Sequence, residues 1–237
     1  MKSICKMFGF MVKQISQEMM MLMLLLAPVL AGIFFRAGIP LLEDYVLARY
    51  GLGELLVPYY ELFSWLIAML TGMLFAFVGG LVILGEIDDN LAKYLMVTPV
   101  GSAGYIASRI ILPAICSGLM AIICVPAFSL VYIGIGKLLV MVISTLFSGV
   151  VTTLLVVAIS TNKVEGMAVG KLSGIFGMTL FVPLLVKGWI KYFFAVFPMY
   201  WIGEWSLSGK VSYILIAIGE YILWIYWLYR RFENKMT

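Results

Sequence analysis

Long uncharged apolar runs recur along the chain and are separated by short polar segments. A helix needs roughly 20 mostly apolar residues to cross the hydrocarbon core of a bilayer, and most of the runs reach this length. The fifth run does so only if it starts near Met167 and the amine of Lys171 extends toward the head groups. The pattern predicts an all-α integral membrane protein with a single transmembrane domain over residues 1–237. Its six spans are expected at 19–38, 62–84, 106–134, 138–161, 167–186 and 211–229.

The composition also favours a membrane protein. Hydrophobic residues make up 64% of the chain and charged residues 12%, against about 45–50% and about 25% in soluble domains. The net charge of +4 is spread along the sequence, so we expect lipids as neighbours and no nucleic acid as a partner. The sequence contains no histidine, the commonest zinc ligand and general base. We therefore expect no catalytic residue and no metal site.

An even number of spans places both termini on one side of the membrane. If that side is the cytoplasm, ten of the 16 Lys and Arg residues lie on it and six lie outside. The positive-inside rule then favours a multi-pass protein of the cell (cytoplasmic or inner) membrane with both termini in the cytoplasm. The ten residues are Lys2, Lys6, Lys13, Lys93, Arg109, Lys163, Lys171, Arg230, Arg231 and Lys235.

Residues 2–17 precede the first span and have apolar side chains at helical spacing, with lysines on the opposite face. This pattern predicts an amphipathic helix that lies in the membrane surface. The apolar positions are Ile4, Phe8, Met11, Val12 and Ile15.

The segment 85–105, between the second and third spans, begins with Glu86, Asp88 and Asp89. Acids suit the N-terminus of a helix, and Pro99 would end a helix after Thr98. The segment predicts a short cytoplasmic helix, and an ordinary solvated connector is the alternative. One face of the helix would carry Ile87, Leu91, Tyr94, Leu95 and Thr98.

The segment 188–210, between the fifth and sixth spans, is rich in aromatic residues, which are typical of membrane interfaces. A segment of this length can dip into the outer leaflet and return if its backbone is helical or shielded by protein. We expect an aromatic outer re-entrant segment, and an aromatic belt without a further role is the alternative. The aromatic residues are Trp189, Tyr192, Phe193, Phe194, Phe197, Tyr200, Trp201 and Trp205.

Two further features lie in the fifth and sixth spans. Gly166, Gly170 and Gly174 recur every four residues and form a flat ridge for close helix packing, in this chain or against a second copy. Glu220 lies near the middle of the sixth span, where a charge is costly and usually faces a cavity or a partner. It is a candidate intramembrane polar site, and a protonated structural residue is the alternative.

Together these features resemble the type-2 ATP-binding-cassette (ABC) export permease family, drug and bacteriocin exporters included. That family's first cytoplasmic loop has an acidic start, a small pair, a leucine-bearing helix, a Val-Thr-Pro turn and a basic residue that opens the third span. The segments NKVEGMAVGK (162–171) and FPMYWIGEW (197–205) also resemble the drug-export branch. The matching loop residues are Glu86, Asp88, Asp89, Leu91, Leu95, Val97, Thr98, Pro99 and Arg109, with Asn90 in place of the small pair.

The resemblance implies that residues 86–99 form a coupling helix seated on a separate ATPase subunit. It also implies that the second and fifth spans line the pathway beside a two-fold axis, with Gly166, Gly170 and Gly174 packing near it. The sequence has no GxxxxGK[ST] phosphate loop, so the partner ATPase would bind ATP and Mg²⁺ and this chain would bind no cofactor. We expect a permease dimer, of two copies or with a sister permease, that exports a hydrophobic or amphipathic drug, peptide or lipid.

Two other classes are weighed against this hypothesis. An ion-coupled secondary transporter or channel would use Glu220, although the sequence lacks a clear internal repeat. A membrane-embedded enzyme would hold a metal and a phosphate substrate at Glu86, Asp88 and Asp89.

Overall fold

The computed structural model describes residues 2–50, 56–96 and 101–236, and within these ranges the chain is helical and contains no strand. Six helical segments of the described ranges are long and apolar enough to cross a membrane, which confirms the predicted all-α fold. They are α2 (Met19–Tyr50), α3 (Tyr60–Asp88), α5 (Gly101–Ile106) continued by the π-helix η2 (Ala107–Ile111) and α6 (Leu112–Phe128), α7 (Ile135–Ile159), α8 (Lys163–Met178) continued by the 3-10 helix η3 (Thr179–Phe181) and α9 (Val182–Leu185), and α11 (Val211–Met236). Shorter helices lie outside them: α1 (Lys2–Gln17), η1 (Val57–Tyr59), α4 (Leu91–Met96), η4 (Trp189–Val196) and α10 (Pro198–Ser208).

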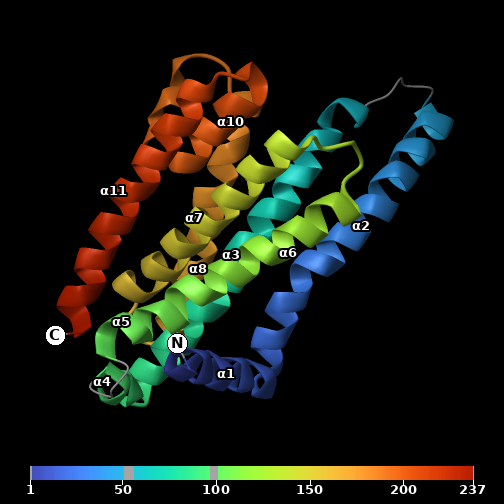
Figure 1. Cartoon of the computed structure of the whole chain (residues 1–237). Coiled ribbons are helices and arrows are strands. Elements are labelled where there is room, and N and C mark those ends of the chain that lie inside the picture. Colours follow the sequence, from blue (N-terminus) through green and yellow to red (C-terminus); the bar gives the residue numbers. More distant parts are fainter. Residues whose placement is uncertain (1, 51–55, 97–100, 237) are drawn as a thin grey trace.

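The centre of the bundle is built from α3 and α7. In each of them 72% of the most apolar stretch is buried inside the chain, whereas in α2 and α11 only 17% is buried. The helices α2 and α11 lie on opposite outer sides of the bundle (Figure 1) and leave their apolar side chains for lipid or another subunit. The hydroxyls of Thr145 and Thr153 on α7 donate to the backbone oxygens of Ala68 and Ala76 on α3, at 3.2 and 2.9 Å. Such polar contacts and close backbone packing hold helices together where the hydrophobic effect is absent.

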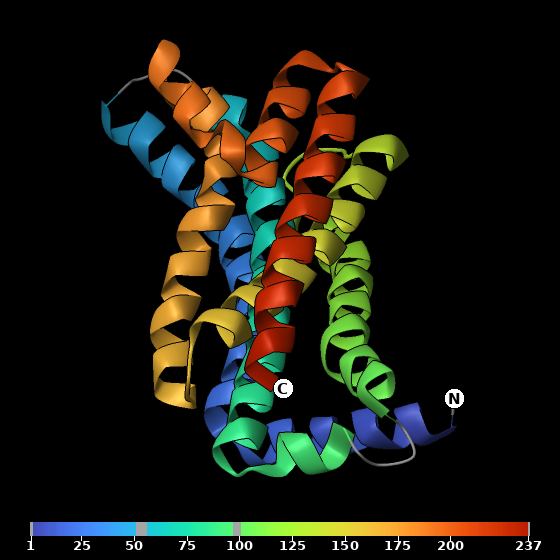
Figure 2. The ribbon, with the colours of Figure 1, turned by 90° about the vertical axis from the view of Figure 1, so that its left-hand side faces the viewer.

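The N-terminal helix α1 lies across one end of the bundle and runs crosswise to the long helices (Figure 2). The short helix α4 and the C-terminus of α11 lie at the same end (Figure 1). Met11 on α1 is buried against Val78 and Leu81 of α3, while Lys6 and Lys13 are exposed. The structure therefore confirms the predicted amphipathic N-terminal helix, and it places α1 and the C-terminal end of α11 at the same end of the bundle.

The first long helix extends past the predicted first span, because α2 continues from residue 38 to Tyr50. The charged residues inside α2 do not end the helix, because groups on other elements form hydrogen bonds with them. The Arg36 guanidinium donates to the backbone oxygen of Ala127 at 2.5 Å. The buried Glu43 carboxylate accepts the backbone N–H groups of Leu56 and Val57. These contacts join α2 to the C-terminal end of α6 and to the residues just before α3.

The other helix boundaries differ from the predicted spans at their ends. The third helix begins earlier, at Gly101, and stops at Phe128 rather than at 134, because Ser129 is extended and its hydroxyl bonds to Ser64 and to the backbone of Val131. The fourth occupies Ile135–Ile159 rather than 138–161. The fifth begins at Lys163 rather than at 167, and the sixth continues beyond 229 to Met236.

The aromatic segment after the fifth span forms η4 and then α10, which folds back beside α11 at the end opposite the termini (Figure 1). Gly203 makes this close packing possible, because a Cβ there would lie 2.2 Å from the backbone oxygen of Leu180. Glu204 accepts hydrogen bonds from the amine of Lys191 and the hydroxyl of Tyr200, at 2.6 and 2.9 Å. The bond to Glu204 raises the pKa of Lys191, while burial and then that carboxylate raise the pKa of Tyr200. The predicted re-entrant segment is thus helical and fixed by polar contacts.

Candidate functional site at the end that carries the termini

A buried ion pair joins three elements at this end. The Glu86 carboxylate on α3 accepts from Nη2 and Nε of Arg109 on η2, at 2.5 and 3.0 Å, and from the Tyr105 hydroxyl on α5, at 2.8 Å. Nη1 of Arg109 also donates to the backbone oxygen of Met7 on α1, at 2.7 Å. Both charged side chains are almost fully buried, with 0% and 1% exposed. We call Glu86, Tyr105 and Arg109 the buried network.

The local backbone explains how Arg109 reaches Glu86. In an α-helix the N–H of residue 113 would donate to the oxygen of residue 109, but Pro113 has no N–H, and the turn before it is a π-helix. Gly79 on α3 faces this turn, and a Cβ there would lie 3.3 Å from the Arg109 backbone oxygen. The missing side chain lets η2 approach α3 closely. A π-turn inside an α-helix frequently marks a functional site.

The structure corrects the expected acidic start of the coupling helix. Glu86 and Asp88 belong to the last turn of α3, and the chain turns at Asn90, whose φ of 58° lies in the left-handed region. The helix α3 continues this far because Arg109 neutralises Glu86 in the interior. Asp89 lies at the end of α3, is exposed, and precedes α4.

The helix α4 carries the remaining predicted coupling residues that the structure describes. Leu91 and Tyr94 are exposed, 41% and 69% respectively, although both are large and apolar or aromatic. Leu95 is half-buried. Thr98 and Pro99 lie outside the described residues. The outer face of α4 therefore presents an apolar surface at the very end of the bundle.

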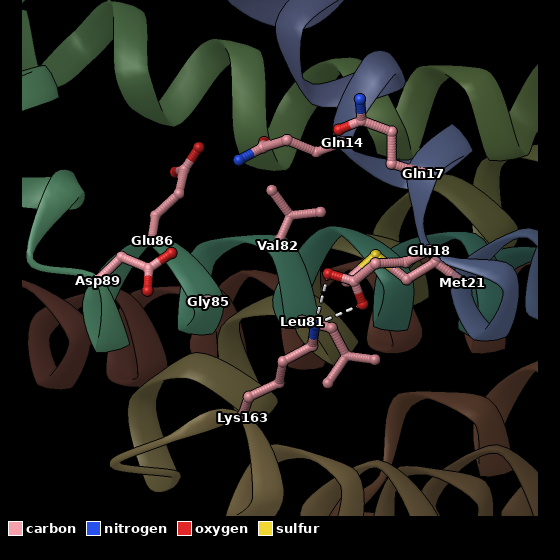
Figure 3. A pocket seen from close by; sticks show the side chains of 10 residues that line it. All are labelled: Gln14, Gln17, Glu18, Met21, Leu81, Val82, Gly85, Glu86, Asp89 and Lys163. Atoms are coloured by element: carbon pink, nitrogen blue, oxygen red, sulfur yellow. Dashed lines mark hydrogen bonds and ion pairs between the residues drawn. The ribbon is translucent and has the colours of Figure 1, made fainter.

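A polar hollow of about 130 Å³ lies beside the buried network, between α1, the start of α2, α3 and α8 (Figure 3). Glu86 from α3 and Gln14 from α1 point into it, and Lys163 reaches Glu18 across its rim (Figure 3). The backbone N–H of Lys163 also donates to Asp88, at 3.0 Å. The amine of Lys163 thus ties the N-terminus of α8 to the junction of α1 and α2, and its backbone N–H ties it to the C-terminus of α3. The hollow is lined by Gln14, Gln17, Glu18, Met21, Leu81, Val82, Gly85, Glu86, Asp89 and Lys163.

The glycines predicted to form a packing ridge divide into two sets. A Cβ at Gly166 or Gly170 would lie 2.2 Å from a side-chain atom of Leu84 or Phe77, so both glycines pack against α3 of the same chain. Gly174 has no atom within 4 Å of its built Cβ. It faces an apolar groove of about 330 Å³ between α3 and α8, lined by Met69, Leu70, Met73, Leu74, Phe77, Gly170, Lys171, Ser173, Gly174, Ile175 and Met178.

One feature of this end was missed from the sequence, although a local signal for it was present. Asn162 accepts from the backbone N–H of Glu165, and Glu165 reaches back to the backbone N–H of Thr161, at 2.9 and 2.7 Å. This arrangement is a variant of the capping box, in which a capping residue is followed three positions later by glutamate; here the glutamate binds the residue before the cap. It fixes the start of α8 next to α3.

Six helices long and apolar enough to cross a membrane, together with an amphipathic N-terminal helix, define a multi-pass membrane protein. The model of one protein family, described as "Fluoroquinolones export permease protein Rv2686c-like", matches residues 11–230. This match covers most of the chain, so the chain belongs to that family of export permeases, which confirms the resemblance found in the sequence. No curated protein and no solved structure matches the chain.

Proposed function

We propose that the chain is the membrane-spanning subunit of an ATP-driven exporter in the cell membrane, with its termini in the cytoplasm. Two permease subunits, either two copies or this chain and a sister permease, would pair with ATPase subunits that bind ATP and Mg²⁺. The observation that carries the proposal is the exposed apolar face of α4, which lies directly beyond the buried network. Membership of an export permease family supports a transport subunit rather than an enzyme.

The connections of α4 supply a route for mechanical coupling. A short turn at Asp89 and Asn90 joins α4 to α3, and Glu86 lies one helical turn before it. Because Arg109 binds both Glu86 and the backbone of α1, a displacement of α4 would move the ends of α1, α3 and η2 together. An ATPase that closes on ATP and pushes on Leu91 and Tyr94 would therefore shift the central helix of the bundle.

The groove between α3 and α8 suggests the nature of the cargo. Its wall contains Met69, Met73, Phe77 and Met178, and methionine side chains adapt to ligands of irregular shape. The second and fifth spans are also the pair that the family resemblance implies for the pathway. We infer a hydrophobic or amphipathic cargo, with fluoroquinolone-like drugs as the first to test because the family description names them.

The test is a Tyr94→Asp substitution in the chain co-expressed with its ATPase. A charge in the apolar contact should reduce transport and the permease-dependent part of ATP hydrolysis by about tenfold or more, because one desolvated charge costs several kcal/mol. Tyr192→Asp is the matched control, since Tyr192 is similarly exposed (61%) but lies at the opposite end of the bundle. Wild-type coupling in Tyr94→Asp, at equal membrane expression, would refute the docking role of α4.

The ion-coupled alternative has one supporting observation, the location of Glu220 on α11 without a hydrogen bond or ion pair among the described residues. A transport assay in vesicles separates the two functions. Drug transport that persists in vesicles without ATPase and follows an imposed proton gradient would favour the ion-coupled transporter.

A further inference from the structure

Glu220 lies deep in the last long helix and on one of its outer faces. It follows Val211, the first residue of α11, by nine positions, which corresponds to roughly 13 Å along the helix axis. Leu223, Trp224 and Trp227 follow at intervals that place them on the same face. These four residues line an open hollow of about 250 Å³. A carboxyl group and two indole rings therefore share a small apolar site at membrane depth.

The two indole rings form a preorganised corner. Their centroids lie 5.6 Å apart and their planes are at 89°. Trp224 is fixed because its Nε1 donates to the backbone oxygen of Val196 at 2.9 Å and its ring stacks on Phe197. The guanidinium of Arg231 lies 5.8 Å from the centroid of Trp227, so that ring already attracts a positive charge. The corner can accept a cation against its π faces.

The Glu220 carboxyl group lacks a counter-charge within the part of the chain that the structure describes. The nearest basic residues along α11 are Arg230 and Arg231, which follow by ten and eleven positions, roughly 15 Å along the axis. An ionised carboxylate at this depth is costly unless it is paired or faces a cavity. Charge complementarity therefore calls for a positive group that is not part of the chain.

We propose that Glu220, Trp224 and Trp227 form a binding site for the charged end of a lipophilic organic cation, which is cargo of the exporter. The carboxylate neutralises the charge, and the indole faces bind it through cation–π interactions. A hydrated metal ion does not fit, because the site offers one carboxyl group and apolar walls instead of several oxygen ligands. The hollow is smaller than the roughly 300–1,000 Å³ of sites that enclose a drug. It suits the cationic end while the remainder of the molecule lies along the apolar exterior of α11.

The proposal rests on the proposed function only in calling the cation a cargo, because binding itself is measured on the full chain without ATPase. The assay is equilibrium dialysis of radiolabelled tetraphenylphosphonium against the purified chain in nanodiscs, with empty nanodiscs subtracted. We expect saturable binding that Glu220→Gln weakens by about tenfold or more and that Glu220→Asp largely retains. Ile216→Gln is the matched control, since it adds the same amide at an exposed position one turn away and keeps the carboxyl group.

A second measurement needs no variant. Dicyclohexylcarbodiimide modifies protonated carboxyl groups in membranes, and tetraphenylphosphonium should protect Glu220 from it, as read by mass spectrometry of the α11 peptide. Absence of saturable binding, equal affinity in Glu220→Gln and the wild type, or absence of protection would overturn the site. Intact cation binding with no ATPase coupling would contradict the proposed function and leave the site standing. Normal coupling without cation binding would contradict the site alone.

Discussion

Substituting Arg109 by methionine removes the positive half of a fully buried ion pair and leaves Glu86 as an uncompensated buried charge. Breaking a buried pair from one side typically costs about 3–5 kcal/mol, because the remaining charge has lost both water and its partner. The substitution also leaves the backbone oxygen of Met7 without its donor, which loosens α1. For a chain of this size the loss corresponds to a decrease in Tm on the order of 10 °C. Thermal unfolding of the purified chain in detergent measures it.

The matched control is Lys137→Met, which breaks a pair with Glu61 whose side chains are 44% and 36% exposed. Pairs this exposed contribute only about 0–1 kcal/mol, so the control should remain near the wild type. The double variant Glu86→Gln, Arg109→Met should be more stable than Arg109→Met alone, because a neutral amide replaces the stranded charge and still accepts from Tyr105. Equal small effects of Arg109→Met and Lys137→Met, or a double variant less stable than either single one, would refute a tight buried network.

Two further predictions concern helix packing and topology. Gly170→Ala should destabilise the chain by about 1–3 kcal/mol, because its new methyl group would overlap a phenylalanine ring. Gly174→Ala should be neutral or stabilising by up to about 1 kcal/mol, because no atom lies near the added methyl group. Thermal unfolding of the two variants in parallel compares them, and equal effects would contradict the described packing of α8. A membrane-impermeant maleimide added to intact cells should label a Tyr192→Cys variant and should label Cys5 only after lysis, because both positions are exposed at opposite ends of the bundle. The reverse pattern would invert the proposed orientation.

The six helices could be predicted from the sequence because the thickness of a bilayer fixes the length of each apolar run. Their ends could not be predicted, since a charge ends a span only when nothing in the fold neutralises it. Arg36 and Glu43 appear as span terminators in the sequence, yet both lie inside α2 because α6 and the start of α3 bind them. Such partners lie 13 to 91 positions away, and periodicity within one helix contains no information about them.

The candidate site was recognised in part, for a related reason. The sequence drew attention to Glu86 as a docking acid and to Arg109 as the basic residue that opens the third span, without pairing them. Their contact, 23 positions apart, depends on the π-turn before Pro113 and on the close approach of Gly79. Neither feature is visible in hydrophobic periodicity. Of the residues predicted to share one helical face, Leu91 and Tyr94 are exposed together on α4, whereas Ile87 belongs to α3 and Leu95 is half-buried.

Glu86 and Glu220 differ in their expected roles because their partners differ, and not because they lie at different depths in the membrane. Glu86 is held by a guanidinium and a phenol inside the protein, so it can transmit a displacement but cannot exchange its partner without opening the fold. Glu220 lines an open hollow together with two indole rings and can bind a charge from outside the chain. In the proposed exporter, Glu86 would keep the helices moving together and Glu220 would hold the charge of a cationic cargo. The contrast between Arg109→Met, which should lower Tm, and Glu220→Gln, which should keep the wild-type Tm and weaken cation binding, tests this division directly.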